Sequence, residues 1–331
     1  MKSTMPLDVY FLNVGHGDCT VIDFDGVRLS VVDINNSKAF DEETENEIRQ
    51  TAKSLGAAAF LEGLTKGYLG YKSLSTYEAE YYEKYYRMLR DPVEFLKGEF
   101  AGRSIFRFIL THPDMDHMTG LYRLCQEGIN ILNFWDTNHG KVLTSADFTG
   151  VCKYDQRDWG EYLRLRSGAG VTTLRLRRGA QAQFYKDDGI WIAAPSDELE
   201  VLAASTDDWN HLSYVLFINY LGNWVVLGGD ATEESWKSIH ARYGEWMKDA
   251  KVRLLKASHH GRDSGYHQPS VEAMSPDNTI ISVGKLPETD ASNKYRKYSK
   301  VYTTRYHGDI LARVWYDGDV WLYNGAGDRI N

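Results

Sequence analysis

Short runs of hydrophobic residues, many alternating with polar ones, recur along most of the chain and predict β-strands. Near the beginning, the runs DVYFLNVG, CTVIDF and VRLSVVDI are separated by GHGD and DG, which favour tight turns. Further strands are predicted at 105–110, in INILNFWDT and through the second half, where helices such as TEESWKSIHARYGEWM interrupt them. Two strand-rich halves with intervening helices predict an α/β fold in which two sheets pack together with helices outside.

A different pattern fills residues 37–102. The runs DEETENEIRQTAKSLGAAAFLEGL and STYEAEYYEKYYRMLRDPVEFLKG are rich in helix formers, with apolar or aromatic residues at helical spacing. We therefore predict a helical insertion, packed beside the mouth of the site described below, within a single domain spanning 1–331. Its tyrosines are predicted to share one helix face, as a lid, a partner surface or an amphipathic cover for the core. They are Tyr77, Tyr81, Tyr82, Tyr85 and Tyr86.

Composition limits the class of protein. Hydrophobic residues make up 43% of the 331 positions and charged residues 25%, which is ordinary for a soluble globular protein. No apolar run approaches the ~20 residues of a membrane span, and the N-terminal stretch lacks the apolar core of a secretion signal. Three scattered cysteines, Cys19, Cys125 and Cys152, argue against a disulfide framework and indicate a cytoplasmic location. The net charge of −8 argues against a general nucleic-acid coat protein, although not against a local basic groove.

The segment THPDMDHMTG, which follows the predicted strand at 105–110, concentrates titratable residues. His112, Asp114, Asp116 and His117 carry imidazole and carboxylate groups, the ligands that zinc and manganese accept. Alternate positions of an extended loop point the same way, so His112, Asp114 and Asp116 are expected to converge, with His117 reaching toward a second ion. The alternative is a solvated acidic loop in which an aspartate caps the next helix.

Three other predicted strands also end in ligand-type residues. VVDI contains Asp33, VVLGGDAT leads to Asp230, and LLKASHHGRDSG leads to His259 and His260. Side chains at strand ends are held by a rigid scaffold, so we expect these residues to meet the first motif at one site. Singly, the aspartates are also explained as turn residues, and His260 as a hydrogen-bond partner of a nearby loop.

The motifs VGHGDCTVID, VVDINN, THPDMDH, VVLGGDAT, LKASHHGRDSG and VYTTRYHGDI, in this order, resemble those of the metallo-β-lactamase superfamily. Within it they are most similar to the soluble hydrolase domain of the ComEC DNA-uptake family. The resemblance covers most of the chain apart from residues 37–102. It implies an αββα sandwich of two mixed β-sheets with outer helices, and metal-dependent hydrolysis, but it does not identify a substrate.

The resemblance also implies two divalent metal ions as cofactors, zinc or manganese. His112 and Asp114 would bind the first ion. Asp116, His117 and His259 would bind the second.

Asp230 would bridge both ions, and Asp33 would orient the motif loop from behind. Two ions roughly 3.5–4 Å apart hold a hydroxide whose pKa is lowered toward neutrality, and they stabilise charge that develops on a phosphoryl oxygen. The predicted catalytic residues are Asp116, at the ions, and His260, which would donate a proton or hydrogen bond to the leaving group.

Two departures from the commoner superfamily pattern affect the first ion. Asp114 stands where a histidine is usual, and a carboxylate is a harder ligand that favours manganese or magnesium. The histidine usual before the strand that leads to GGD is missing, and the segment WNHLSYV offers Asn210, His211 and Ser213 instead. The first ion is therefore expected to bind weakly. His16, in the VGHGD turn, is either near the site or a packed turn histidine.

A phosphodiester is the leading substrate, which predicts a phosphodiesterase or nuclease whose partner is DNA or a nucleotide. The basic stretch 157–178 and a second one near 294–300, with interleaved aromatic residues, suggest a phosphate-binding groove. Candidate substrate-binding residues are Arg177, Arg178 and Tyr295, for each of which a solvated strand face is the simpler explanation. The alternatives are hydrolysis of a small non-nucleotide substrate such as a lactone, or a degenerate binding or effector module.

Overall fold

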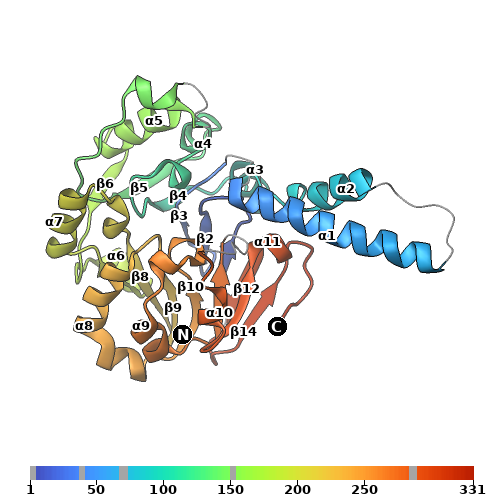
Figure 1. Ribbon diagram of the computed structural model, residues 1–331. Coiled ribbons are helices and arrows are strands. Elements are labelled where there is room, and N and C mark those ends of the chain that lie inside the picture. Colours follow the sequence, from blue (N-terminus) through green and yellow to red (C-terminus); the bar gives the residue numbers. More distant parts are fainter. Residues whose placement is uncertain (1–4, 37–41, 67–73, 150–153, 283–288) are drawn as a thin grey trace.

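Two β-sheets face each other across the main hydrophobic core in the computed structural model (Figure 1). The structure describes residues 5–36, 42–66, 74–149, 154–282 and 289–331. Both sheets are mixed, because each combines parallel and antiparallel neighbours. The α/β class and the packing of two mixed sheets, predicted from the sequence, are confirmed.

The first sheet is antiparallel from β14 to β3 and parallel from β3 to β6. In spatial order its strands are β14 (Val320–Tyr323), β13 (Ile310–Val314), β1 (Leu7–Phe11), β2 (Thr20–Phe24), β3 (Arg28–Val32), β4 (Ile105–Ile109), β5 (Ile131–Asp136) and β6 (Thr172–Arg175).

The second sheet is parallel from β12 to β9 and antiparallel from β9 to β7. In spatial order its strands are β12 (Lys300–Thr303), β11 (Asn278–Ile281), β10 (Val252–Lys256), β9 (Asn223–Leu227), β8 (Val215–Tyr220) and β7 (Ile190–Ala194).

Alternating side chains divide each strand between an inner and an outer core. Ile22 and Leu216 point into the core between the sheets, whereas their neighbours Val21 and Phe217 pack under outer helices. The first sheet is covered by α3 (Pro92–Glu99), α4 (Leu121–Gln126) and α5 (Gln156–Arg166). The second is covered by α7 (Asp197–Thr206), α8 (Glu233–Asp249), α9 (Gln268–Met274) and α10 (Ser292–Tyr295). The layers are therefore helix, sheet, sheet, helix.

Shorter elements complete the part of the chain that the structure describes. They are α6 (Gln183–Asp187), α11 (Thr304–His307) and the 3₁₀ turns η1 (Met115–His117), η2 (Ser145–Phe148), η3 (Trp209–Leu212), η4 (His259–Gly261) and η5 (Asp263–Gly265). A search of the described helices found none with the length and apolar character required to cross a bilayer.

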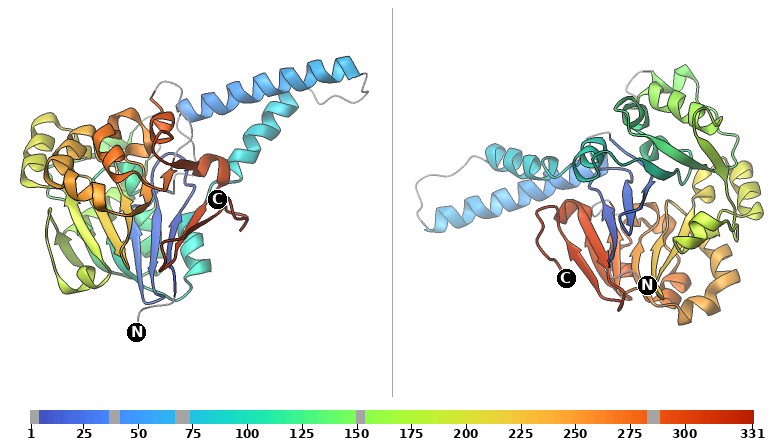
Figure 2. Two further views of the ribbon diagram at one scale, coloured as in Figure 1. Left: turned by 90° about the horizontal axis from the view of Figure 1, so that it is seen from below. Right: turned by 180° about the vertical axis from the view of Figure 1, so that it is seen from behind.

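The described part of the 37–102 segment consists mostly of helices, with turns at 87–91 and 100–102. Its helices α1 (Glu42–Lys66) and α2 (Leu74–Tyr86) form a hairpin that projects from the sandwich, while α3 belongs to the body (Figure 2). The tyrosines of α2 do not share one face: Tyr85 is 5% exposed and Tyr86 is 44% exposed. Instead, Tyr81 pairs with Tyr85 and Tyr82 with Tyr86, because residues four apart are neighbours on a helix. The side chain of Tyr77 lies outside the described residues.

The root of the hairpin is tied to the turn that contains His16. Asn13 donates to the carbonyl oxygen of Met88 at 3.0 Å, and its own carbonyl accepts the Arg90 N–H at 2.7 Å. Beside them, the Tyr85 ring packs against that of Tyr306, at 6.2 Å between centroids. The insertion therefore adjoins the site at its root, although the hairpin itself extends away from the body.

Replacing Leu96 of α3 with alanine is expected to lower the free energy of unfolding by roughly 2–5 kcal/mol, because this buried side chain fills the outer core. The matched change Leu55→Ala in α1 truncates a side chain that is 42% exposed and should alter stability by less than about 0.5 kcal/mol. Urea denaturation followed by circular dichroism measures both. Equal losses would show that α1 is packed as tightly as α3.

Candidate metal centre

Loops from both sheets meet at one edge of the sandwich. Asp33 follows β3 and His112 follows β4, which are parallel neighbours in the first sheet. Asp230 follows β9 and His260 follows β10, which are parallel neighbours in the second. Because the carboxyl ends of parallel strands lie at the same edge of a sheet, these loops bring their side chains to a common point.

Two imidazoles and two carboxylates face one another at this point. The Nε2 atom of His260 lies 3.6 Å from Oδ2 of Asp116 and 3.2 Å from Oδ2 of Asp230. The Nε2 atom of His117 lies 3.8 Å and 3.2 Å from the same two oxygens. We call Asp116, His117, Asp230 and His260 the central ligand set. Ligand atoms around a tetrahedral zinc ion are about 3.4 Å apart, and these four contacts lie near that distance. Among the described residues, Asp116 and His260 converge with His16, and His117 and Asp230 converge with His112.

Hydrogen bonds behind the imidazoles orient them toward this point. Nδ1 of His117 lies 2.8 Å from Oδ2 of Asp33, an acceptor, so in the neutral ring Nδ1 carries the proton and Nε2 the lone pair. The Thr111 hydroxyl donates to Asp33 and therefore accepts from Nδ1 of His112, which leaves a lone pair on Nε2 there too. Carboxylate–histidine pairs of this kind hold the imidazoles of metal sites.

Several buried atoms at this edge have no hydrogen-bond partner within the part of the chain that the structure describes, among them Nε2 of His112, Nε2 of His117 and Oδ1 of Asp230. Each of these residues is at most 2% exposed, and one ligand atom of each lies within 4.8 Å of the others. A buried polar atom without a partner is costly unless an ion or a water binds it. The donor set therefore fits a divalent ion.

Charge is balanced inside the central ligand set. Burial opposes ionisation of Asp116 and Asp230, but the neighbouring histidines outweigh it and hold both pKa values well below their usual range. Burial also opposes protonation of His117 and His260, but Asp230 above all raises both pKa values well above the usual range. The site therefore favours positive charge, which a divalent cation supplies in place of these protons.

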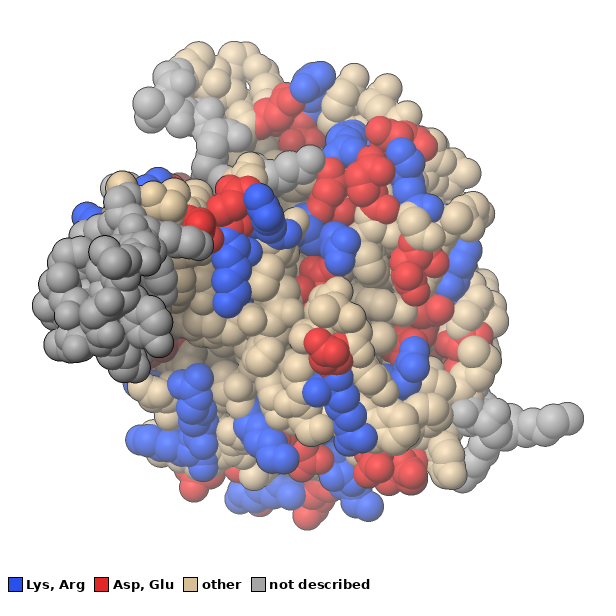
Figure 3. All heavy atoms as spheres, turned by 90° about the vertical axis from the view of Figure 1, so that its right-hand side faces the viewer, with Lys and Arg blue, Asp and Glu red and all other residues tan. Residues whose placement is uncertain are grey.

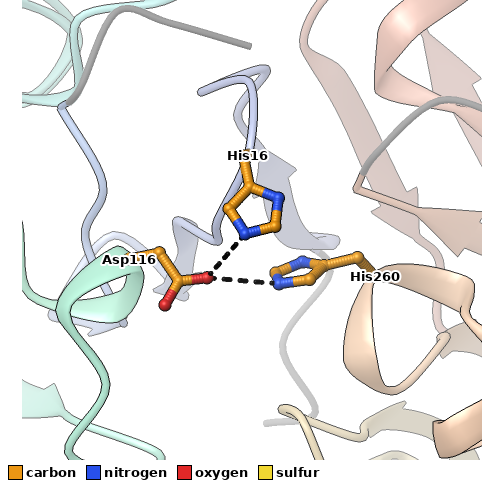
Figure 4. A group of neighbouring side chains, drawn as sticks. All are labelled: His16, Asp116 and His260. Carbon is orange, nitrogen blue, oxygen red and sulfur yellow. Dashed lines mark ion pairs between the residues drawn. The ribbon is translucent and has the colours of Figure 1, made fainter. Parts of the chain in front are cut away.

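A third imidazole lies beside Asp116 (Figure 4). Nε2 of His16 is 3.3 Å from the same Asp116 oxygen that faces His260, and the two imidazole centroids are 5.2 Å apart. The His16 side chain is 18% exposed, so it lies on the solvent side of the central ligand set. Gly17, at φ +119°, allows this approach, because a Cβ there would lie 2.3 Å from the Asp116 carbonyl oxygen.

A buried ion pair lies behind His260. The Lys256 ammonium, at the end of β10, donates to Oδ2 of Asp18, and Oδ1 of Asp18 lies 3.5 Å from Nδ1 of His260. Burial opposes ionisation of Asp18, but Lys256 and His260 lower its pKa. Sequence analysis missed both residues of this pair. The charged positions in GHGD and LLKASHH, each beside a predicted strand end, were the available signal.

Asp114 points away from the central ligand set. Its Oδ1 accepts a hydrogen bond from the Lys141 ammonium, and its Oδ2 lies 3.6 Å from Nε2 of His112. Burial opposes ionisation of Asp114, but His112 and Lys141 lower its pKa. Among the described residues, Asp114 belongs to none of the groups whose ligand atoms converge within 4.8 Å. Lys141 was not foreseen from the sequence.

The structure brings His260, not His259, to the central ligand set. Nδ1 of His259 lies 2.7 Å from the Ser264 hydroxyl, and His259 is in none of the converging groups found among the described residues. Both histidines have positive φ angles, 48° and 55°. This unusual turn sends the second imidazole, rather than the first, toward Asp116 and Asp230.

Among the described residues, His211 is in none of the groups of converging ligand atoms. Its Nδ1 lies 2.7 Å from the Thr232 hydroxyl and its Nε2 lies 3.7 Å from Oδ2 of Asp208, which also accepts the backbone N–H of Asn210 through Oδ1. The Ser213 hydroxyl accepts the Asp230 N–H at 3.1 Å, and so supports the loop that carries a ligand.

The arginines predicted to bind phosphate are engaged in ion pairs. Arg177 and Arg178 both pair with acidic residues of α7. The same holds for Arg157, Arg164, Arg166 and Arg175, each of which pairs with an aspartate or glutamate. Tyr295 is 2% exposed and packs edge-on against Tyr266 in the outer core, so the prediction that it stacks on a substrate is wrong for this conformation.

No protein-family model matches the chain, and a search of curated proteins found no match. The resemblance to the metallo-β-lactamase superfamily therefore rests on the sequence motifs alone.

Replacing Lys256 with methionine is expected to lower the free energy of unfolding by about 3–5 kcal/mol, because Asp18 would keep a buried charge without its cation. The double variant Asp18→Asn/Lys256→Met should recover part of this loss, because it removes both charges. Urea denaturation in the presence of a chelator measures the two. A double variant no more stable than Lys256→Met would contradict the pairing.

Proposed function

We propose that the protein is a divalent-metal-dependent hydrolase of the metallo-β-lactamase fold that acts on phosphodiester bonds. The observation that carries this proposal is the central ligand set, whose imidazole and carboxylate atoms face one another at 3.2–3.8 Å. The helix–sheet–sheet–helix layers support it, as does the placement of the ligand loops at the ends of β3, β4, β9 and β10. The order of the motifs along the chain agrees with both.

The central ligand set would hold the ion, and zinc or manganese suits its mixture of nitrogen and oxygen donors. When bound, such an ion lowers the pKa of water and offsets charge on a phosphoryl oxygen. Asp33 fixes the ring of His117 from behind. Nδ1 of His260 lies 3.2 Å from the Ser282 hydroxyl, with the Asp18 carboxylate at 3.5 Å. In this proposal His260 is a metal ligand, which replaces both its predicted role as a proton donor and the predicted ligand His259.

The charges at the site and on the surface around it limit the class of substrate. The carboxylates of the site attract a cation, and it is the bound divalent cation that would attract the oxygens of a phosphodiester. A long polynucleotide also requires a groove of available cations, whereas the arginines between 157 and 178 described above are ion-paired. On the face that carries the hairpin, Lys and Arg lie interspersed with Asp and Glu (Figure 3). We therefore favour a compact phosphodiester, such as a cyclic nucleotide, over long DNA or RNA.

Protein loaded with zinc or manganese is expected to hydrolyse bis-p-nitrophenyl phosphate, and a chelator should abolish the activity. Asp116→Ala and His117→Ala should each lower kcat by on the order of 100-fold or more, because each removes one of the four side chains proposed to bind the ion. A panel with cyclic nucleotides, single-stranded DNA, RNA and a lactone defines the substrate. Turnover of the lactone alone would overturn the phosphodiester assignment, and metal binding without any turnover would indicate a binding or effector module.

His260→Ala should weaken metal binding by at least about tenfold, whereas His259→Ala should change it little. Of these two histidines, only His260 faces the carboxylates of Asp116 and Asp230. Isothermal titration with zinc and with manganese compares the two variants directly. His240→Gln is the control, because His240 lies in α8 against His267. Equal losses for His259→Ala and His260→Ala would show that the ligand assignment is wrong.

A further inference from the structure

The imidazole of His16 faces ligand atoms of the site. Its Nε2 atom lies 3.3 Å from Oδ2 of Asp116, and Nε2 of His260 lies 3.6 Å from the same oxygen (Figure 4). One ligand atom of each of these three residues lies within 4.8 Å of the other two. We call His16, Asp116 and His260 the outer group, because the side chains of His16 and Asp116 are 18% and 16% exposed.

A second group of three donors is more deeply buried. It consists of His112, His117 and Asp230, which are at most 2% exposed and whose ligand atoms also lie within 4.8 Å of one another. We call these residues the inner group. Each group supplies two imidazoles and one carboxylate, and three protein ligands with one open position for water are typical of catalytic zinc sites. Oδ2 of Asp230 lies 3.2 Å from Nε2 of both His117 and His260, so this carboxylate joins the two groups.

The turn that carries His16 is fixed in place by its neighbours. The Asn35 side chain donates to the His16 carbonyl oxygen, and Gly17 lies against the backbone of the loop that carries the first motif. Asp18, in the same turn, lies 3.5 Å from Nδ1 of His260, on the other edge of that ring from Nε2. A side chain on such a fixed backbone keeps its position before an ion binds, which lowers the entropic cost of binding.

We propose that His16 is a metal ligand, so that the outer group binds one divalent ion and the inner group binds a second. This inference rests on the proposed function and adds His16 and His112 to the donors named there. Two imidazole nitrogens that converge on one carboxylate oxygen are arranged as ligands of a common cation, which accepts a lone pair from each. The histidine of the VGHGD turn is then part of the site, and the partial exposure of the outer group leaves its ion open to a substrate.

Metal titration tests this assignment without reference to activity. Full-length protein is stripped with a chelating resin and titrated with zinc by calorimetry, and the bound metal is counted by mass spectrometry. The wild type should bind two equivalents. His16→Ala should weaken one of them by at least about tenfold and leave the other nearly unchanged, because it removes a ligand from the outer group alone. His112→Ala should weaken the other equivalent, so the double variant should bind both ions weakly.

Cobalt(II) supplies a readout that a packing role would not change, because its visible absorption depends on the number and kind of its ligands. The spectrum of the cobalt-loaded protein should change in His16→Ala. It should also change in His16→Gln, whose amide keeps a polar group beside Asp116 but is a poor zinc or cobalt ligand. His240→Ala is the matched control and should keep both equivalents and the wild-type spectrum, because His240 lies in α8 against His267.

Circular dichroism verifies that each variant is folded, and His16→Gln is used alone if His16→Ala is not. Wild-type affinity in His16→Gln, or a loss of affinity without a change in the cobalt spectrum, would overturn the role of His16 and leave the proposed function intact. One equivalent in the wild type would overturn the division into two groups. A wild type that binds no metal would overturn the proposed function and this inference together.

Discussion

Buried negative charge is the constraint around which this site is built. The carboxylates of Asp18, Asp33 and Asp230 are each at most 3% exposed, and Asp116 lies beside them. Ionised groups removed from water are tolerated only when cations and hydrogen-bond donors surround them. Lys256, the imidazoles and the Thr111 N–H and hydroxyl do this in the structure. Their positions follow from the need to compensate one compact group of charges.

Much of the scaffold could be predicted because it depends on local pattern. Alternating hydrophobic runs marked most strands, and ligand-type residues at their ends marked the loops that meet. That His260, rather than His259, faces Asp116 and Asp230 could not be predicted in this way. It depends on two consecutive residues with positive φ, a conformation that neither histidine indicates on its own. The helical spacing of the α2 tyrosines likewise said nothing about which of them the body would cover.

Pairings between distant residues were beyond the sequence for a different reason. Lys256 and Asp18 are separated by 238 positions and belong to different sheets, and Lys141 reaches Asp114 only because β5 lies beside β4. The position of Lys256 beside a predicted strand end does not by itself distinguish it from a lysine on the surface. The basic stretch 157–178 led to the opposite error. Its arginines were predicted to bind phosphate, but in the structure they form ion pairs with acidic residues.

The ion pair between Lys256 and Asp18 also indicates when the candidate site assembles during folding. The turn that carries Asp18 belongs to the first sheet and Lys256 to the second, so the pair forms only when the two sheets dock. Contacts between residues so far apart in sequence form late in folding, after shorter-range structure. The central ligand set likewise draws Asp116 and His117 from one sheet and Asp230 and His260 from the other. A partly folded chain, or a nascent one lacking its last third, therefore holds no assembled candidate site.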